Sequence, residues 1–264
     1  MKRTYLSGAI ALAFAVTALV YSPTATPTVL AQATNNCQGL PTASELRQQL
    51  VASQNIAPGT DGIGGRVGGL FEGTRMWGAI VNRDGEICVY GTSTADETQV
   101  WPGSQAIAKA KAYTANAFSL DTFALSTART YTFTQPGHSL WSLGQSNLFN
   151  ADLLVAPGGK GDKNQIAGGL IFFGGGVPIY QGGKIVGGLG ISGDTSCADH
   201  EIAKRVRHLL HMDPSGGPTA DDIVYVPPDN MATVGVFAHP VCLNTWRNGV
   251  FIGNEAPASY PHAP

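Results

Sequence analysis

Residues 172–194 alternate apolar runs with glycine in a pattern that predicts an antiparallel β-hairpin. The two apolar runs are Val177–Tyr180 and Lys184–Ile191, and Gln181-Gly182-Gly183 lies between them. Glycine accommodates the positive φ of a tight hairpin turn without steric strain. This glycine-rich hairpin is the most informative stretch of the sequence.

Helices are predicted where apolar residues recur every three or four positions. Ser196–His211 is such a segment, and Asp194 or Thr195 can accept hydrogen bonds from its first free N–H groups. Trp101–Leu120 is another, with Ser104 as a candidate cap. Its predicted core face consists of Ile107, Ala110, Tyr113, Thr114, Ala117 and Phe118. The remaining predicted helices are Ala43–Ser53, started by Thr42 or Ser44, and Asp121–Thr130.

A second hairpin is predicted around Asn82–Gly85, where Asp-Gly joins the apolar runs Met76–Val81 and Glu86–Tyr90. Ile223–Val226 and Val234–Phe237 have the composition of short edge strands. The order of these elements predicts an α/β (α+β) fold in which helices pack on one face of an antiparallel sheet.

The N-terminus has the features of a secretory signal peptide. Lys2 and Arg3 precede an apolar run, Ala9–Val20, that is short for a membrane span. Ala31-Gln32-Ala33 supplies the small residues that a signal peptidase recognises. Residues 1–33 are therefore predicted to be removed, which makes the protein periplasmic or secreted. An uncleaved N-terminal anchor is the alternative.

Four cysteines remain after the predicted processing: Cys37, Cys88, Cys197 and Cys242. An even number in an oxidising compartment favours two disulfides, for which three connectivities exist. Because Cys37 and Cys242 lie in the terminal extensions, the bridges are expected to attach the chain ends to the central body. The formal net charge is −2 and 13% of residues are charged. This composition does not favour a nucleic-acid partner, and it favours burial of some surface in an oligomer.

Gly188-Leu189-Gly190-Ile191-Ser192-Gly193 fits the G-x-G-x-x-G pattern of dinucleotide-binding turns. That fingerprint requires the turn after a parallel strand, whereas these glycines fall inside a predicted hairpin strand. We therefore expect them to allow a helix or another subunit to approach the strand closely.

The histidines offer two candidate ligand sites. On the last predicted helix, a solvated face is expected opposite the apolar residues, at His200, Lys204, Arg207 and His211. The alternative is metal ligation by His208 and His211, which lie one turn apart, without an evident third ligand. His138 follows Pro136-Gly137 and precedes Leu140 and Trp141. A neutral imidazole in such surroundings can ligate haem iron, although loop histidines are commonly plain surface residues. On the central helix, one interpretation has Lys111 and Tyr113 facing the edge of a cleft. The alternative places Tyr113 in the core and both Lys109 and Lys111 in water.

Two segments, AKAKAYTANAF (Ala108–Phe118) and GGGVPIYQGGKIVGGLGISGDTS (Gly174–Ser196), resemble the GlcG/HbpS-like family. The resemblance covers about Met76 to His208. It implies a profilin-like or PAS-like sandwich with an antiparallel sheet of about five strands. The predicted organisation is a signal peptide (1–33), an N-terminal extension (34–73), the family domain (74–211) and a Pro/Gly-rich extension (212–264). The two extensions lie outside the family pattern.

For function, the resemblance implies binding of haem or a related tetrapyrrole, with iron handling or haem degradation in some members. It also implies a homo-oligomer, often a tetramer or octamer. Thr114 is similar to a family residue implicated near the haem. In this interpretation the central helix and its following loop hold the macrocycle, Lys109 or Lys111 pairs with a propionate, and His138 is the axial ligand. The alternatives are a haem-degrading or other small-molecule enzyme, or an accessory or sensory partner of a periplasmic oxidoreductase.

Overall fold

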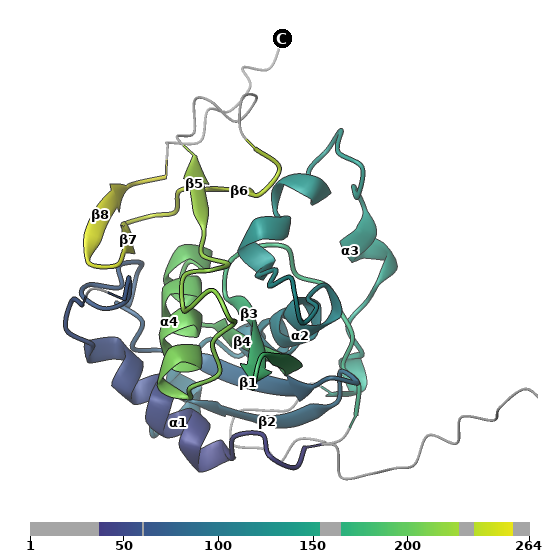
Figure 1. Cartoon of the computed structure of the whole chain (residues 1–264), viewed down its shortest axis with the longest axis horizontal. Helices are drawn as coiled ribbons and strands as arrows, with labels where there is room; N and C mark the ends of the chain where they lie inside the picture. The colour runs from purple at the N-terminus through teal and green to yellow at the C-terminus, as the bar shows by residue number, and fades with distance from the viewer. Residues whose placement is uncertain (1–36, 60, 154–164, 227–234, 256–264) are drawn as a thin grey trace, which may run out of the picture. The chain divides into compact units, whose positions relative to one another are not determined.

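The computed structural model describes residues 37–59, 61–153, 165–226 and 235–255 (Figure 1). The predicted signal peptide and the C-terminal residues 256–264 lie outside the described residues. The described part contains a four-stranded antiparallel sheet in the order β2-β1-β4-β3. Its strands are β1 (Trp77–Asn82), β2 (Ile87–Thr92), β3 (Gly176–Gln181) and β4 (Lys184–Ser192). Both predicted hairpins and the mixed fold class with an antiparallel sheet are thereby confirmed.

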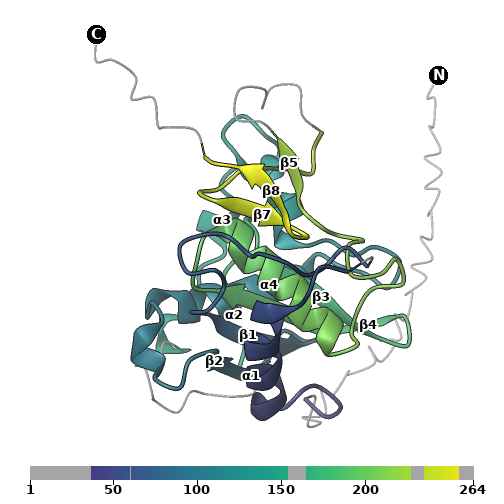
Figure 2. The ribbon, with the colours of Figure 1, turned by 90° about the vertical axis from the view of Figure 1, so that its left-hand side faces the viewer.

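Helices cover both faces of this sheet (Figure 2). The long helices are α1 (Ala43–Ala52), α2 (Gly103–Ala117) and α4 (Ser196–Leu209), and α3 (Leu143–Ser146) is a single turn. Thr42 caps α1 in a capping box with Glu45, and Thr195 caps α4 by accepting from the Ala198 N–H. These two caps are as the sequence indicated, whereas α2 begins after Pro102 without a side-chain cap, so the prediction for Ser104 is wrong.

The two faces have separate apolar cores, which explains why helices are found on both. Strand residues such as Ile80 and Leu189 pack with α1 and α4, whereas Ala79 and Val81 pack with α2. Successive side chains of a strand point to opposite faces, so β1, buried at all six positions, requires cover on each side. The expectation that helices pack on one face only is therefore wrong.

Helix α2 lies very close to the sheet, because its small residues face the sheet in place of the larger residues of the predicted apolar face. Its buried face contains Ala108 and Ala112, whereas Ile107 and Tyr113 are only half-buried. A Cβ atom built on Gly190 would lie 1.9 Å from the Ala108 carbonyl oxygen. The contact is thus one of alanine and glycine backbones rather than of large apolar side chains, and the glycine motif serves helix packing within the chain.

The segment predicted as a helix over Asp121–Thr130 is largely irregular. Only Thr127–Thr130 forms a short 3-10 helix, and Leu120 and Phe123 form an isolated antiparallel bridge. The Ser119 hydroxyl accepts from the Leu125 N–H and donates to its carbonyl. These tertiary bonds replace the bonds that a continuous helix would make.

The polar face of α4 is buried, contrary to the predicted solvated face. His200, Lys204 and Arg207 are each at most 1% exposed. The C-terminal extension covers them, and it provides Asp221 for Arg207 and Asp222 for Lys204 at 2.7 Å and 3.0 Å. Buried charges require partners, and here the partners come from a part of the chain distant in sequence.

Two further small sheets lie in the C-terminal extension. They are a parallel pair, β5 (Val224–Val226) with β6 (Ala238–Pro240), and an antiparallel pair, β7 (Thr245–Arg247) with β8 (Val250–Gly253). The strand predicted at Ile223–Val226 is confirmed. The one predicted at Val234–Phe237 is displaced, because β6 begins at Ala238, and Val234 itself lies outside the described residues.

The disulfides are Cys37–Cys88 and Cys197–Cys242. Each joins a terminal extension to the central body, as the sequence predicted, and together they are consistent with an extracellular protein. None of the helices in the described ranges has the length and apolar character that crossing a bilayer requires.

The free energy of unfolding is expected to fall at low pH, in part because the contact between Asp222 and α4 is lost. Burial alone would raise the pKa of Asp222, but the adjacent His200 ring, with Nε2 3.5 Å from Asp222 Oδ1, and the Lys204 charge outweigh it and hold this pKa below its ordinary 3.8. As the pH falls, the unfolded carboxyl is protonated first, so this stabilisation is full above about pH 4 and is lost as the pH falls through the folded pKa. Asp222→Asn should reduce the free energy of unfolding by about 2 kcal/mol at pH 7.

Urea denaturation between pH 2.5 and pH 7 measures this effect. The difference between wild type and Asp222→Asn should shrink below about pH 4. Asp152→Asn, at an exposed position, serves as the control and should leave stability at pH 7 nearly unchanged. A difference that stays constant down to the lowest pH would contradict the assignment.

Candidate functional site

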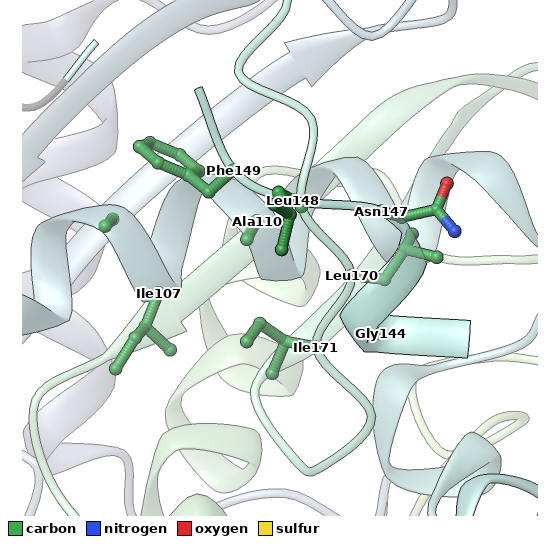
Figure 3. Close-up of a pocket in the computed structure, with 10 residues that line it drawn as sticks. Ile107, Ala110, Gly144, Asn147, Leu148, Phe149, Leu170 and Ile171 are labelled. Atoms are coloured by element: carbon green, nitrogen blue, oxygen red, sulfur yellow. The ribbon is translucent and has the colours of Figure 1, made fainter. Parts of the chain in front are cut away.

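An apolar pocket of about 240 Å³ lies between α2, α3 and residues 169–171 (Figure 3). Ile107 and Ala110 come from α2, and Leu170 and Ile171 come from the facing segment. The local sequence explains the pocket, because alanine and glycine positions of α2 and its neighbours leave space that larger residues would fill. Apolar concavities of this kind are the usual sites for small-molecule ligands.

A second pocket of about 440 Å³ adjoins the first. The two share Gly144, Leu148, Leu170 and Ile171 as lining residues. The second pocket adds aromatic and polar residues, namely Tyr131, Phe172, Phe173, Thr134, Gln135, Ser142 and Gln145. Together the two pockets form a site with an apolar interior and a polar border, which we call the paired pocket.

Residues 170–173 form one wall of the paired pocket, and buried side chains hold this wall in place. The Thr114 hydroxyl accepts from the Ile171 N–H at 3.0 Å. The Thr127 hydroxyl donates to the Phe173 carbonyl at 2.6 Å. Because threonine side chains have few rotamers, these bonds fix the wall with little loss of conformational entropy.

His239 fixes the residue that follows this wall. Its Nε2 atom accepts from the Gly174 N–H at 3.2 Å, and its ring packs at a tilt against the Tyr131 ring, with the two ring centroids 5.2 Å apart. Burial lowers the pKa of His239 to about 4, so the imidazole is neutral near pH 7. The C-terminal extension therefore supports one wall of the pocket.

Lys111 and Lys109, the predicted propionate partners, are both buried and bonded within the chain. Lys111 Nζ lies 2.7 Å from Asp199 Oδ2 and 5.0 Å from the Phe173 ring centroid. Burial lowers the pKa of Lys111 and raises that of Asp199 to about 6. Lys109 Nζ donates to Gln105 and to the Leu153 carbonyl, both at 3.0 Å. The alternative expectation, that these lysines lie in water, is wrong.

The other predicted site residues are dispersed around the paired pocket. Thr114 lies behind the wall, and Tyr113 packs against Gly85 at the first hairpin turn. His138 is exposed on the loop 135–142, whose two end residues, Gln135 and Ser142, line the larger pocket. His208 Nδ1 forms a hydrogen bond with Asp213 Oδ2 at 2.6 Å, whereas His211 is exposed to solvent.

The residues that line the paired pocket were largely missed from sequence. Tyr131, Leu148 and Phe172 lie in irregular segments, where neither helical nor strand periodicity identifies a buried face. One signal was available, since the pair Phe172-Phe173 directly precedes three glycines. Apolar aromatic residues beside a backbone that can approach closely are typical of binding sites.

A protein-family model described as "Haem degrading protein HbpS-like" matches residues 72–207. No curated protein matches the chain. Among solved structures, a complex of PduOC with haem is 21% identical, with a TM-score of 0.44, and the match covers 64% of this chain and 92% of that one. Klebsiella pneumoniae ORFY is 19% identical, with a TM-score of 0.41 and coverage of 65% and 90%. HbpS is 19% identical, with a TM-score of 0.37 and coverage of 66% and 92%.

Proposed function

We propose that this chain, which belongs to the HbpS-like family, binds haem or a related tetrapyrrole in the paired pocket. The observation that carries the proposal is that every residue lining the paired pocket lies inside the matched segment 72–207. The pocket is therefore built entirely from the part of the chain that the family model matches.

The lining fits an apolar planar ligand with a polar edge. Phe172 and Phe173 offer aromatic faces, and Leu148, Leu170 and Ile171 offer aliphatic contacts. Burying such surface is favourable by about 25 cal/mol per Å². Amide side chains at the border, among them Gln135 and Gln145, can donate hydrogen bonds to carboxylates. Bound haem would supply an iron centre able to take axial ligands or to react with oxygen.

His138 remains the proposed axial ligand of the haem iron. Tyr131 is the competing candidate for that role. His138 lies on the loop that borders the larger pocket, whereas the Tyr131 side chain lines that pocket. Both imidazole and phenolate are known ligands of haem iron. Propionate pairing with Lys109 or Lys111 stays a prediction, and it requires that the internal bonds of these lysines open.

Titration of the purified protein with hemin tests the proposal. A Soret shift that saturates near one equivalent per chain is expected. Leu148→Glu should weaken binding by about tenfold or more, because it places a carboxylate against the macrocycle. Leu148 is 78% exposed, so this change should not disturb folding.

Val250→Glu is the matched control, because Val250 is also an exposed apolar residue, at 62%, and lies in β8 away from the paired pocket. It should bind hemin as the wild type does. In the same titration, His138→Ala should change the position of the Soret band, and Tyr131→Phe should not. Absence of any Soret shift at micromolar hemin contradicts the proposed function.

Haem degradation is the second candidate function, and the name of the matching family model favours it. Adding a reductant and oxygen to the hemin-loaded protein separates the two. Turnover would abolish the Soret band and release iron, whereas simple binding would leave the band in place. A third possibility, an accessory or sensory partner of an oxidoreductase, predicts a stoichiometric protein partner and no bound tetrapyrrole.

Export and homo-oligomerisation belong to the same proposal. The two disulfides support an oxidising compartment for the mature chain. Exposed apolar residues such as Trp101 and Phe123 offer surface that a subunit contact would bury. Light scattering of the purified chain would show a tetramer or octamer if the family expectation holds.

A further inference from the structure

A cluster of three metal-ligating side chains lies outside the paired pocket. It consists of Cys197 on the first turn of α4, His239 in β6 and Cys242 just after β6. Their ligand atoms all lie within 4.8 Å of one another, and all three residues are buried. No other group of three such residues with this proximity occurs among the described parts of the chain. In the structure the two sulfur atoms are joined in a disulfide, which leaves neither of them free to bind a cation.

We propose that reduction of the Cys197–Cys242 disulfide converts this cluster into a binding site for one thiophilic cation of the Zn²⁺ class. A dithiol reductant supplies two electrons and two protons and becomes a disulfide itself, so the S–S bond breaks and two thiols form. A phosphine supplies two electrons and takes the oxygen of a water molecule to become a phosphine oxide, and that water supplies the two protons. The cation then displaces the two thiol protons and binds two thiolates and one imidazole. Thiolate and imidazole ligands select Zn²⁺ over the hard cations Mg²⁺ and Ca²⁺.

The position of Cys197 favours the thiolate form that a cation requires. The residue is the second of α4, a helix of 14 residues, where unpaired N–H groups and the helix dipole stabilise negative charge. The Ser196 hydroxyl lies 3.3 Å from Cys242 Sγ, so it offers a polar contact to the second sulfur. Both contacts are available to stabilise the negative charge of a thiolate once the disulfide is reduced.

The bonds of His239 prepare it as the third ligand. Its Nδ1 atom lies 2.7 Å from the Pro240 carbonyl oxygen and donates to it, which leaves the lone pair on Nε2. A histidine that ligates a metal commonly donates its other N–H to such a carbonyl. The bond from the Gly174 N–H to Nε2 is long, at 3.2 Å, and a cation would replace it.

The charges near the cluster favour a cation that is bound by two thiolates over a cation that is bound beside the intact disulfide. Lys111 acts on His239 electrostatically and opposes added positive charge there. A divalent cation bound by two thiolates adds no net charge to this buried region, whereas the same cation bound to the disulfide and His239 would add two. The site is therefore expected to form only after reduction.

Thiol protection in the full-length protein tests the proposal. The protein is reduced with a phosphine, incubated with or without Zn²⁺, desalted, alkylated and mapped by mass spectrometry. We expect about one Zn²⁺ per chain and alkylation of Cys197 and Cys242 slowed about tenfold or more, because bound thiolates are poor nucleophiles. Cys37 and Cys88 should be alkylated at the same rate with and without the metal.

Two comparisons make the assignment specific. The oxidised protein should retain no Zn²⁺ after desalting, and reduced His239→Phe, which keeps an aromatic ring beside Tyr131, should bind it at least about tenfold more weakly. Equal alkylation of all four cysteines in reduced wild type with Zn²⁺ would overturn the proposal. So would retention of the metal by the oxidised chain, or protection of Cys37 and Cys88 instead.

Discussion

Gly190→Ala is expected to reduce the free energy of unfolding by about 3 to 5 kcal/mol, or to prevent folding altogether. The added Cβ would lie 1.9 Å from the Ala108 carbonyl oxygen and 2.5 Å from the Ala112 nitrogen. Both contacts are with backbone atoms, which cannot move aside as a flexible side chain does. Helix α2 would have to separate from β4, and the apolar contacts between them would be lost.

Gly91→Ala is the matched control for this prediction. Gly91 lies in β2 of the same sheet, and a Cβ at this position meets nothing within 4 Å. Its effect should remain within about 0.5 kcal/mol. Urea denaturation of both variants measures the difference. Equal stability of the two would show that α2 does not approach β4 as closely as the structure describes.

Asp221→Ala is expected to reduce the free energy of unfolding by about 3 to 5 kcal/mol. Asp221 accepts from both terminal nitrogens of Arg207, at 2.7 Å and 3.0 Å, and neither residue is exposed. Removing the carboxylate leaves a buried guanidinium whose remaining polar partners within the described ranges are Asp213 and the carbonyls of Pro178 and Pro218. Since Asp221 belongs to the C-terminal extension and Arg207 to α4, the loss would also loosen the extension.

Two comparisons distinguish this effect from the simple loss of a carboxylate. Asp121→Ala removes the partner of the exposed Lys184 and should change stability little, because solvent screens that pair. The double variant Arg207→Met with Asp221→Leu should be more stable than Asp221→Ala, because it leaves no unpaired buried charge. If Asp221→Ala behaves like Asp121→Ala, the ion pair does not hold the extension on α4.

Local signals in the sequence were sufficient for the two hairpins of the main sheet and for the starts of α1 and α4. Apolar runs separated by Asp-Gly or Gly-Gly predicted both hairpins, and Thr42 and Thr195 marked the starts of α1 and α4. These elements depend on neighbours within a few positions, so their signals are carried by the adjacent residues. The glycine motif identified close packing in the same way, although it did not say whether a helix or another subunit approaches.

The candidate site could not be derived in that way. The paired pocket is assembled from α2, the loop 131–149 and residues 169–173, which meet only when the chain is folded. Of the predicted site residues, Thr114 supports its wall, whereas Lys109 and Lys111 are occupied by bonds inside the protein. The choice between a solvated lysine and a buried one depends on a partner that can lie anywhere in the sequence.

The sequence by itself therefore determined the hairpins, two of the helix starts, the family and the attachment of both chain ends by disulfides. The tertiary structure alone decided which faces are buried. His200, Lys204 and Arg207 resemble a solvated helix face in sequence, yet the C-terminal extension covers them with Asp221 and Asp222. The physical reason is that periodicity reports the polarity of a face, whereas burial depends on whether a distant segment neutralises that face.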